Sequence, residues 1–426
     1  MATLVIPWKP WEKFGFRFMF LFFGITSLLC VMLNAFIASL AFSKDGFDMN
    51  KLFKPLTGAF HWLDKHIYHI GYDPKIHASF PGDNHFGVTF YLTVILFGIL
   101  ATMIWSIIDK KRTNYDKLFY WFCVYLRYIL AITIIGYGID KIIPIQMSSP
   151  SAAVLTEPYG NLNRFNVLWT FMGVSTGYMI FTGSLEVIAG LLLFFRRTAL
   201  AGSLLMVAIL SNIVALNCFY NVGVKLFSLQ MLLIALFLLA PYYQRLFQFF
   251  FNDSNTVAAS PKRFVFQNKQ KKYLVAAILL LVPLIAIGLS LVANYKTYLR
   301  VAANEREQKI YNVAAFVAKD TLAPLTTDTL RWKRVLLFVD GHNMVVYNMQ
   351  DKGKWFKFKI DSIKKTLTLN NDDKAKMKVF HYTNPAKDMM HLAGKWNGKD
   401  ISVSLKLSPL DSIPLNKEKI MFFEEE

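Results

Sequence analysis

Seven apolar segments, each long enough to cross a bilayer, constrain the fold of this chain more than any other feature. They cover approximately residues 14–42, 86–108, 118–138, 176–195, 198–219, 224–249 and 273–292. A membrane-spanning helix needs about 20 predominantly apolar residues. Only 18% of the chain is charged and 54% is hydrophobic, whereas about 25% of a soluble globular protein is charged. The sequence therefore predicts an all-α polytopic membrane bundle of about seven transmembrane helices.

Short basic links between these segments predict the orientation. Lysine and arginine gather in 109–117, at Arg196 and Arg197, and in 250–272, and short basic links face the cytoplasm. This places the N-terminus in the cytoplasm, and the loops 43–85 and 139–175 and the C-terminal region outside, which in a bacterium is the periplasm. We expect a bacterial inner-membrane protein in contact with the lipid bilayer. The same links explain much of the net charge of +19, so no nucleic-acid partner is expected.

The residues after the last span follow a different pattern. Short runs such as VLLFVDGHNMVVYN, KWFKFKID and KDISVSLKL alternate with a period of two, and turns such as Asn397–Gly398 separate them. Asn-Gly between alternating runs is typical of β-hairpins. We predict a transmembrane domain over 1–296 and a helical stalk with a linker over 297–330. A small extracytoplasmic antiparallel β domain is predicted over 331–426, as a meander or partial barrel of about six to eight strands.

Two ionisable residues fall inside neighbouring spans. Arg127 and Glu186 each lie ten residues from the inner end of their predicted helix. At 1.5 Å per residue both would be about 15 Å deep, half-way across a ~30 Å hydrocarbon core. A charge at that depth needs a partner, so we expect Arg127 to pair with Glu186. The pair would be either a functional site or a clamp between two helices.

A second polar group is predicted near the outer face, on the third, fifth and sixth spans. Its members are Tyr137, Asp140, Lys141, Asn212, Asn217, Lys225 and Gln230. Together they could line a cavity that opens to the periplasm. The alternative is that the lysines extend to the interface and the amides join helices.

The loop before the second span is rich in histidine. His66 and His69 stand three residues apart, so one helical face could offer both to a metal ion. A helix lying on the bilayer with its histidines facing water explains the pattern better, because no cysteine and no second such pair accompanies them. No histidine falls inside a predicted span, so we expect no haem.

Four motifs occur in order along the bundle: YGIDKIIPIQM, LWTFMG, FTGSLEVIAGLLLFFRRTALAG and NVGVKLFS. With these motifs, residues 85–250 resemble the DoxX-like membrane proteins. The similarity is to the long variety, whose bundle is followed by a strand-rich tail, and the segment LAGKWNGKDISVSLK resembles part of that tail. The resemblance implies a four-helix core over about 118–249. Where the loop before the second span can carry GSGD, this chain has FPGD. The resemblance carries over as motif residues Tyr137, Asp140, Lys141, Glu186, Arg196, Arg197 and Lys225.

The resemblance also implies a function, without a reaction. Related proteins have been linked to membrane redox complexes, so we expect a non-catalytic accessory subunit of a redox or quinone-linked complex. Its cofactor would be a quinone and its partners membrane redox proteins. One alternative is a solute- or lipid-binding or transport protein that uses the outer cavity. The other is an assembly factor whose β domain binds a periplasmic protein.

Overall fold

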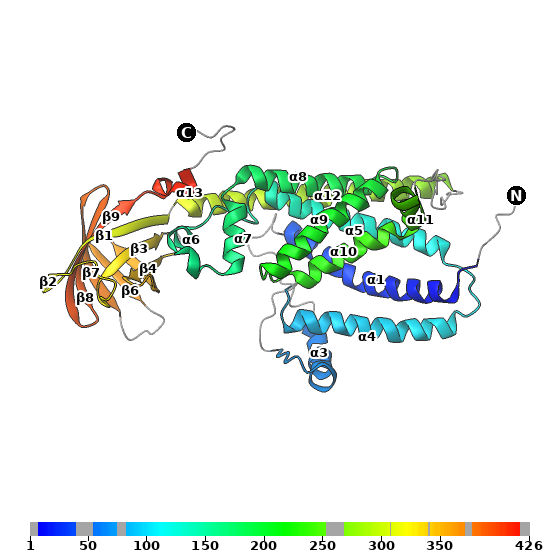
Figure 1. The fold of residues 1–426 in the computed structure, drawn as a ribbon, viewed down its shortest axis with the longest axis horizontal. Helices are drawn as coiled ribbons and strands as arrows, with labels where there is room; N and C mark the ends of the chain where they lie inside the picture. Colours follow the sequence, from blue (N-terminus) through cyan, green and yellow to red (C-terminus); the bar gives the residue numbers. More distant parts are fainter. Residues whose placement is uncertain are drawn as a thin grey trace. The chain divides into compact units, whose positions relative to one another are not determined.

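The computed structural model describes residues 7–39, 54–74, 82–252, 268–306, 308–339, 341–370 and 377–417. The chain separates into two compact units, one of residues 1–146 with 177–296 and one of residues 147–176 with 297–426. The first is helical and the second is built around a β-barrel (Figure 1). The basic link 250–272 and the first outer loop lie partly outside the described residues.

The described part of the chain has seven helices that are long and apolar enough to cross a membrane, which confirms the predicted number. Shorter helical segments connect or extend them: η1 (Lys54–Leu56), α3 (Thr57–Leu63), η2 (Asp64–Tyr68), η4 (Ala240–Tyr242), α11 (Tyr243–Phe247) and η5 (Gln248–Asn252). The long helices are α1 (Pro10–Ser39), α4 (His85–Ile108), α5 (Asp116–Ile142), α8 (Thr176–Phe194), α9 (Ala199–Phe219), α10 (Lys225–Leu239) and α12 (Lys269–Arg306).

The outer surface of the helices carries many large apolar side chains. Large side chains such as Phe97, Ile108 and Phe181 are more than half exposed in the chain alone. Helix α12 is the least covered, with only 11% of its most apolar stretch buried by protein. A surface of this size and composition needs lipid around it. The chain is therefore a membrane-embedded protein that contacts the lipid bilayer.

Glycine allows α5 and α8 to approach closely. A Cβ on Gly183 would meet the carbonyl oxygen of Gly138 at 2.5 Å, and one on Gly190 would meet Ile135 at the same distance. Small residues at such contacts are the usual means by which membrane helices pack. Because residue numbers rise along α5 while they fall along α8 at these contacts, the two helices run antiparallel.

The second unit contains a closed barrel, and the prediction of a small meander or partial barrel is wrong on this point. Each strand pairs antiparallel with its neighbour, and β1 also pairs with β9 from Ile310–Ser408 to Val317–Ser402. The two-residue β2 pairs only with the end of β1. The strands are β1 (Gln308–Ala318), β2 (Asp320–Thr321), β3 (Trp332–Phe338), β4 (Asn343–Asn348), β5 (Gly353–Asp361), β6 (Thr366–Asn370), β7 (Lys378–Ala386), β8 (Met389–Trp396) and β9 (Lys399–Ser408).

The barrel closes because a strand forms inside the expected stalk and linker. Residues 308–318 supply β1, which bridges β3 and β9 and so removes both unpaired edges of the sheet. An eight-stranded barrel is just wide enough for side chains to fill. Here aromatic rings fill it. The rings of Trp332 and Trp396 meet edge to face with their centroids 4.8 Å apart, and the ring of Phe380 contacts both.

A second, smaller core covers part of the outside of the barrel. Ala152 packs with Ile310, Leu336 and Val345, and its backbone N–H donates to the side-chain oxygen of Gln308 at 2.9 Å. Because 147–176 packs on the barrel, this loop and the C-terminal region lie on the same side of the membrane. The short helices of this unit are α6 (Ala152–Thr156), η3 (Tyr159–Asn161), α7 (Arg164–Gly173), η6 (Leu410–Ser412) and α13 (Pro414–Lys417).

Candidate functional site

Glu186 pairs with Lys141, so the predicted pair of Arg127 with Glu186 is wrong. The Nζ of Lys141 donates to both carboxylate oxygens, at 2.7 and 2.8 Å. The two residues are 7% and 2% exposed. Equal depths for Arg127 and Glu186 would require the inner ends of α5 and α8 to lie at the same height in the membrane. The glycine contacts instead set the last turn of α5 beside Glu186, and they set Arg127 near the end of α8.

The ion pair belongs to a polar cluster that joins three helices. The ring of Tyr137 lies 5.9 Å from the Nζ of Lys141. Next along α5, the carboxylate of Asp140 accepts a hydrogen bond from the side-chain amide of Asn294 on α12. The glycine contact of α5 and α8 is one helical turn from Lys141 and Glu186. The cluster therefore clamps α5, α8 and α12 through groups that satisfy one another.

The other residues of the predicted outer cavity are divided among separate contacts. Gln230 accepts from the hydroxyl of Tyr91 on α4 at 2.6 Å. The Nζ of Lys225 lies 3.5 Å from Asp83. Asn217 is buried, whereas Asn212 is exposed on the surface of α9. These contacts fit the alternative prediction for this group, in which polar side chains join helices.

Asp83 has a role that the sequence did not indicate. Its carboxylate accepts from the backbone N–H groups of Lys225 and Leu226, at 2.6 and 2.9 Å. These amides begin α10, so Asp83 caps that helix from a loop 142 residues earlier in the chain. The aspartate of FPGD thus ties the loop before α4 to the start of α10.

The two histidines proposed as metal ligands make other contacts. The His66 ring stacks on Trp62 and is hydrogen-bonded to its carbonyl oxygen at 2.9 Å. His69 has a φ of 53° at the end of η2. Across the residues with described positions, no three His, Cys, Asp or Glu side chains gather as metal ligands.

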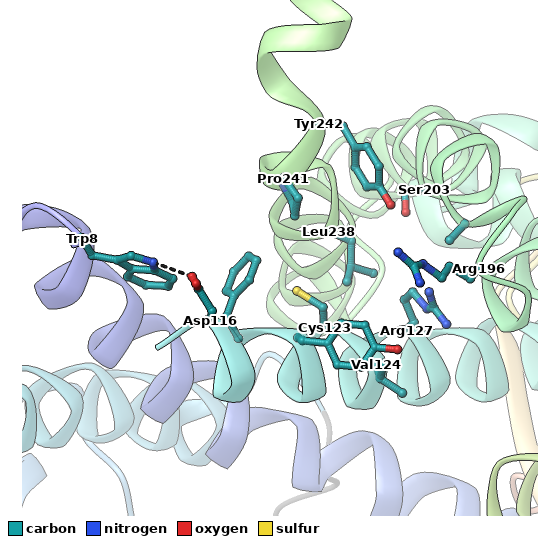
Figure 2. A pocket seen from close by; sticks show the side chains of 13 residues that line it. Trp8, Asp116, Cys123, Val124, Arg127, Arg196, Ser203, Leu238, Pro241 and Tyr242 are labelled. Atoms are coloured by element: carbon teal, nitrogen blue, oxygen red, sulfur yellow. Dashed lines mark hydrogen bonds between the residues drawn. The ribbon is translucent and has the colours of Figure 1, made fainter. Parts of the chain in front are cut away.

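Arg127 lines a pocket of about 300 Å³ between α5, α9 and the end of α10. Figure 2 shows its guanidinium group beside that of Arg196, near the hydroxyls of Tyr242 and Ser203. Within the described part of the chain, the buried Nε of Arg127 has no hydrogen-bond partner. We call this the two-arginine pocket. It is lined by Trp8, Asp116, Phe119, Tyr120, Cys123, Val124, Arg127, Arg196, Ala199, Ser203, Leu238, Pro241 and Tyr242.

The charges in the two-arginine pocket are separated along its length. Asp116 is the only carboxylate among the described residues that line the pocket, and it accepts from the indole N–H of Trp8 at 2.8 Å. Figure 2 places this pair at the opposite end from Arg127 and Arg196. The arginine end is therefore suited to an anion. The sequence indicated Arg127 by its depth, whereas it indicated Arg196 only as part of a basic link and as a motif residue of the resemblance.

No family model and no solved structure matches the chain. A curated relative, the uncharacterized protein YwoB of Bacillus subtilis (strain 168), is 31% identical over 113 residues. The match covers 71% of that relative and 26% of this chain. The chain belongs to the family of YwoB. The name of YwoB assigns no activity, and the predicted DoxX-like membership stays a prediction.

Proposed function

We propose that the chain is a membrane-embedded binding protein that takes up an anionic amphiphile in its two-arginine pocket. The observation that supports this most is the meeting of Arg127 and Arg196 at one end of the pocket, while Asp116, the carboxylate among its described lining residues, lies at the other end. A bound anion would offset the charge of the Arg127 guanidinium and would also complete the hydrogen bonding of its buried Nε.

The apolar part of the lining supports an amphiphile rather than a small inorganic ion. Figure 2 shows Leu238 and Pro241 between the two polar ends, and Phe119 and Val124 are further apolar lining residues. Ligand pockets are commonly apolar with a few converging polar groups that fix orientation. A molecule with an anionic head and an apolar body matches this arrangement, and the surrounding bilayer is a source of such molecules.

The redox role expected from the sequence stays a prediction, as do the quinone, the redox partners, the inner membrane and the orientation. That role came from the resemblance, and Glu186, one of its motif residues, is bound by Lys141. The second alternative, an assembly factor whose β domain binds a periplasmic protein, also stays a prediction. Its barrel interior is filled by side chains, so a partner would use the outer surface.

Native mass spectrometry of the full chain, purified in a mild detergent, tests the proposal. We expect the wild-type protein to retain an anionic amphiphile that Arg127→Gln and Arg196→Gln lose. Arg197→Gln is the matched control, because Arg197 is the next residue, is exposed and does not line the pocket. Equal retention by all three variants, or retention of only uncharged amphiphiles by the wild-type protein, would contradict the proposal.

A further inference from the structure

The arginine end of the two-arginine pocket gathers hydrogen-bond donors from four places in the chain. Arg127 comes from the middle of α5, Arg196 from the link after α8, Ser203 from α9 and Tyr242 from η4. Figure 2 shows the two guanidinium groups and the two hydroxyls around the same space. The donors of this end therefore come from separate elements of the helical unit and line the same space.

We infer that this end of the pocket binds the phosphate group of a phosphate ester, an inference that rests on the proposed function. One guanidinium group already satisfies a planar carboxylate, through two parallel hydrogen bonds. A phosphate group has up to three free oxygens in a tetrahedral arrangement and carries a charge of about −1.5 to −2 as a monoester. Two guanidinium groups with two hydroxyls match both the number of its oxygens and its charge.

The opposite end of the pocket sets the direction of the ligand. The carboxylate of Asp116, held by the indole N–H of Trp8, would repel a phosphate. The phosphate is therefore directed to Arg127 and Arg196, and the uncharged part of the ester lies along Phe119 and Leu238. Like-charge repulsion at one end and attraction at the other give a single orientation.

The size of the pocket limits the ligand to a headgroup and a short part of its body. A volume of about 300 Å³ is at the lower end of the range for small-molecule sites, about 300–1,000 Å³. A two-chain lipid is larger, so its acyl chains would remain in the bilayer. A lipid headgroup and a soluble phosphate ester share the chemistry that this site recognises, and the experiment below separates the two sources.

The test measures binding of four probes to the full chain in detergent by native mass spectrometry titration. The probes are dioleoyl phosphatidic acid, dioleoylglycerol without the phosphate, oleate with a carboxylate head, and glycerol 3-phosphate without acyl chains. We expect phosphatidic acid to bind at least ~10-fold more tightly than dioleoylglycerol and oleate. Removing a charge-assisted hydrogen bond corresponds to a ~10- to 100-fold loss of affinity. We expect this loss in Arg127→Gln and in Arg196→Gln, and no change in Arg197→Gln.

The outcomes separate this inference from the proposed function. If oleate binds as tightly as phosphatidic acid and both depend on the arginines, the phosphate inference is wrong and the proposed function stands. If glycerol 3-phosphate binds as tightly as phosphatidic acid, the phosphate inference is supported and the amphiphile is overturned. If phosphatidic acid binds equally to wild type, Arg127→Gln and Arg196→Gln, both are overturned.

A second pair of variants keeps the test valid if Arg127→Gln does not fold. Arg127→Lys preserves the charge but removes the two-pronged donor, and Tyr242→Phe removes one hydroxyl without changing the charge. We expect each to weaken phosphatidic acid binding several-fold while gel filtration shows an unchanged profile. Unchanged affinity in both variants would overturn the assignment of the phosphate to this end of the pocket.

Discussion

Lys141 on α5 and Glu186 on α8 form a buried ion pair in which one ammonium group donates to both oxygens of one carboxylate. The pair lies one helical turn from the contact of Gly138 with Gly183, which brings the two helix backbones close enough for it to form. Packing and charge therefore depend on each other at this crossing. A substitution that separates the helices should weaken the ion pair, and loss of the ion pair should loosen the helix contact.

Replacing Lys141 by Met should destabilise the helical unit by about 3–5 kcal/mol, because it leaves the Glu186 carboxylate buried without a counter-charge. Unfolding of the chain in mixed micelles measures this loss. The double variant Lys141→Met with Glu186→Gln should recover part of it, since no charge then remains uncompensated. Lys225→Met is the control: its ion pair with Asp83 is longer and more exposed, so a loss of about 1 kcal/mol or less is expected. Equal losses in the two lysine variants would contradict the clamp.

Replacing Gly183 by Ala should push α5 and α8 apart. The added Cβ would lie 2.5 Å from the carbonyl oxygen of Gly138 and 2.9 Å from the Cβ of Lys141, and overpacking of this kind costs about 1–3 kcal/mol. Thermal unfolding in detergent measures it. Gly24→Ala in α1 is the matched control, because nothing lies within 4 Å of its new Cβ, so the substitution should be neutral or stabilising by up to ~1 kcal/mol. A neutral Gly183→Ala would show that the contact is not tight.

The membrane spans could be predicted because length and composition alone decide them, and the structure confirms their number. The ion pair could not be predicted, because the register of two helices depends on their packing. The depth of Arg127 and Glu186 was counted from helix ends that are not level. Gly138 and Gly183 set the true register, and their importance appears only when the two helices are seen together.

In the barrel, too, the pairing of distant segments could not be predicted from the sequence. Alternation indicates β3 to β9, but closure depends on β1, whose residues 308–318 follow a long helix and fall within the predicted stalk and linker. The two-arginine pocket also depends on residues that are distant in sequence. In the sequence, Arg196 and its neighbour Arg197 are two equivalent residues of one basic link. In the structure, Arg196 lines the pocket and Arg197 does not.

The turn that follows η2 should lose its order in acid. Although burial of Asp64 opposes its ionisation, the backbone N–H groups of Ile70, Gly71 and Tyr72 donate to its carboxylate and hold its pKa below the usual range. The stabilisation is therefore fully present above the unfolded pKa of about 3.9 and is lost as the pH falls through the lower folded value.

Hydrogen exchange of these three amides between pH 6 and pH 2 measures the effect, after correction for the intrinsic rate. Protection should be constant at the upper end of this range and should fall at the lower end. Asp64→Asn should weaken protection at pH 6 and remove its dependence on pH, because the amide oxygen accepts hydrogen bonds without a charge. Protection that stays constant to pH 2 in the wild-type protein would show that the charge of Asp64 is not needed.

Removing the carboxylate of Asp83 should loosen the start of α10. In Asp83→Ala the amides of Lys225 and Leu226 lose their acceptors, and loss of a helix cap costs about 0.5–2 kcal/mol. Hydrogen exchange at these two amides should therefore accelerate, while the interior of α10 near Ile234 stays protected. Asp83→Asn removes the charge and keeps one acceptor oxygen, whereas the two amides are bound by different oxygens of the carboxylate. It should therefore preserve the protection of one of the two amides and lose that of the other. If exchange at both amides were as fast in Asp83→Asn as in Asp83→Ala, charge rather than capping would hold the loop to α10.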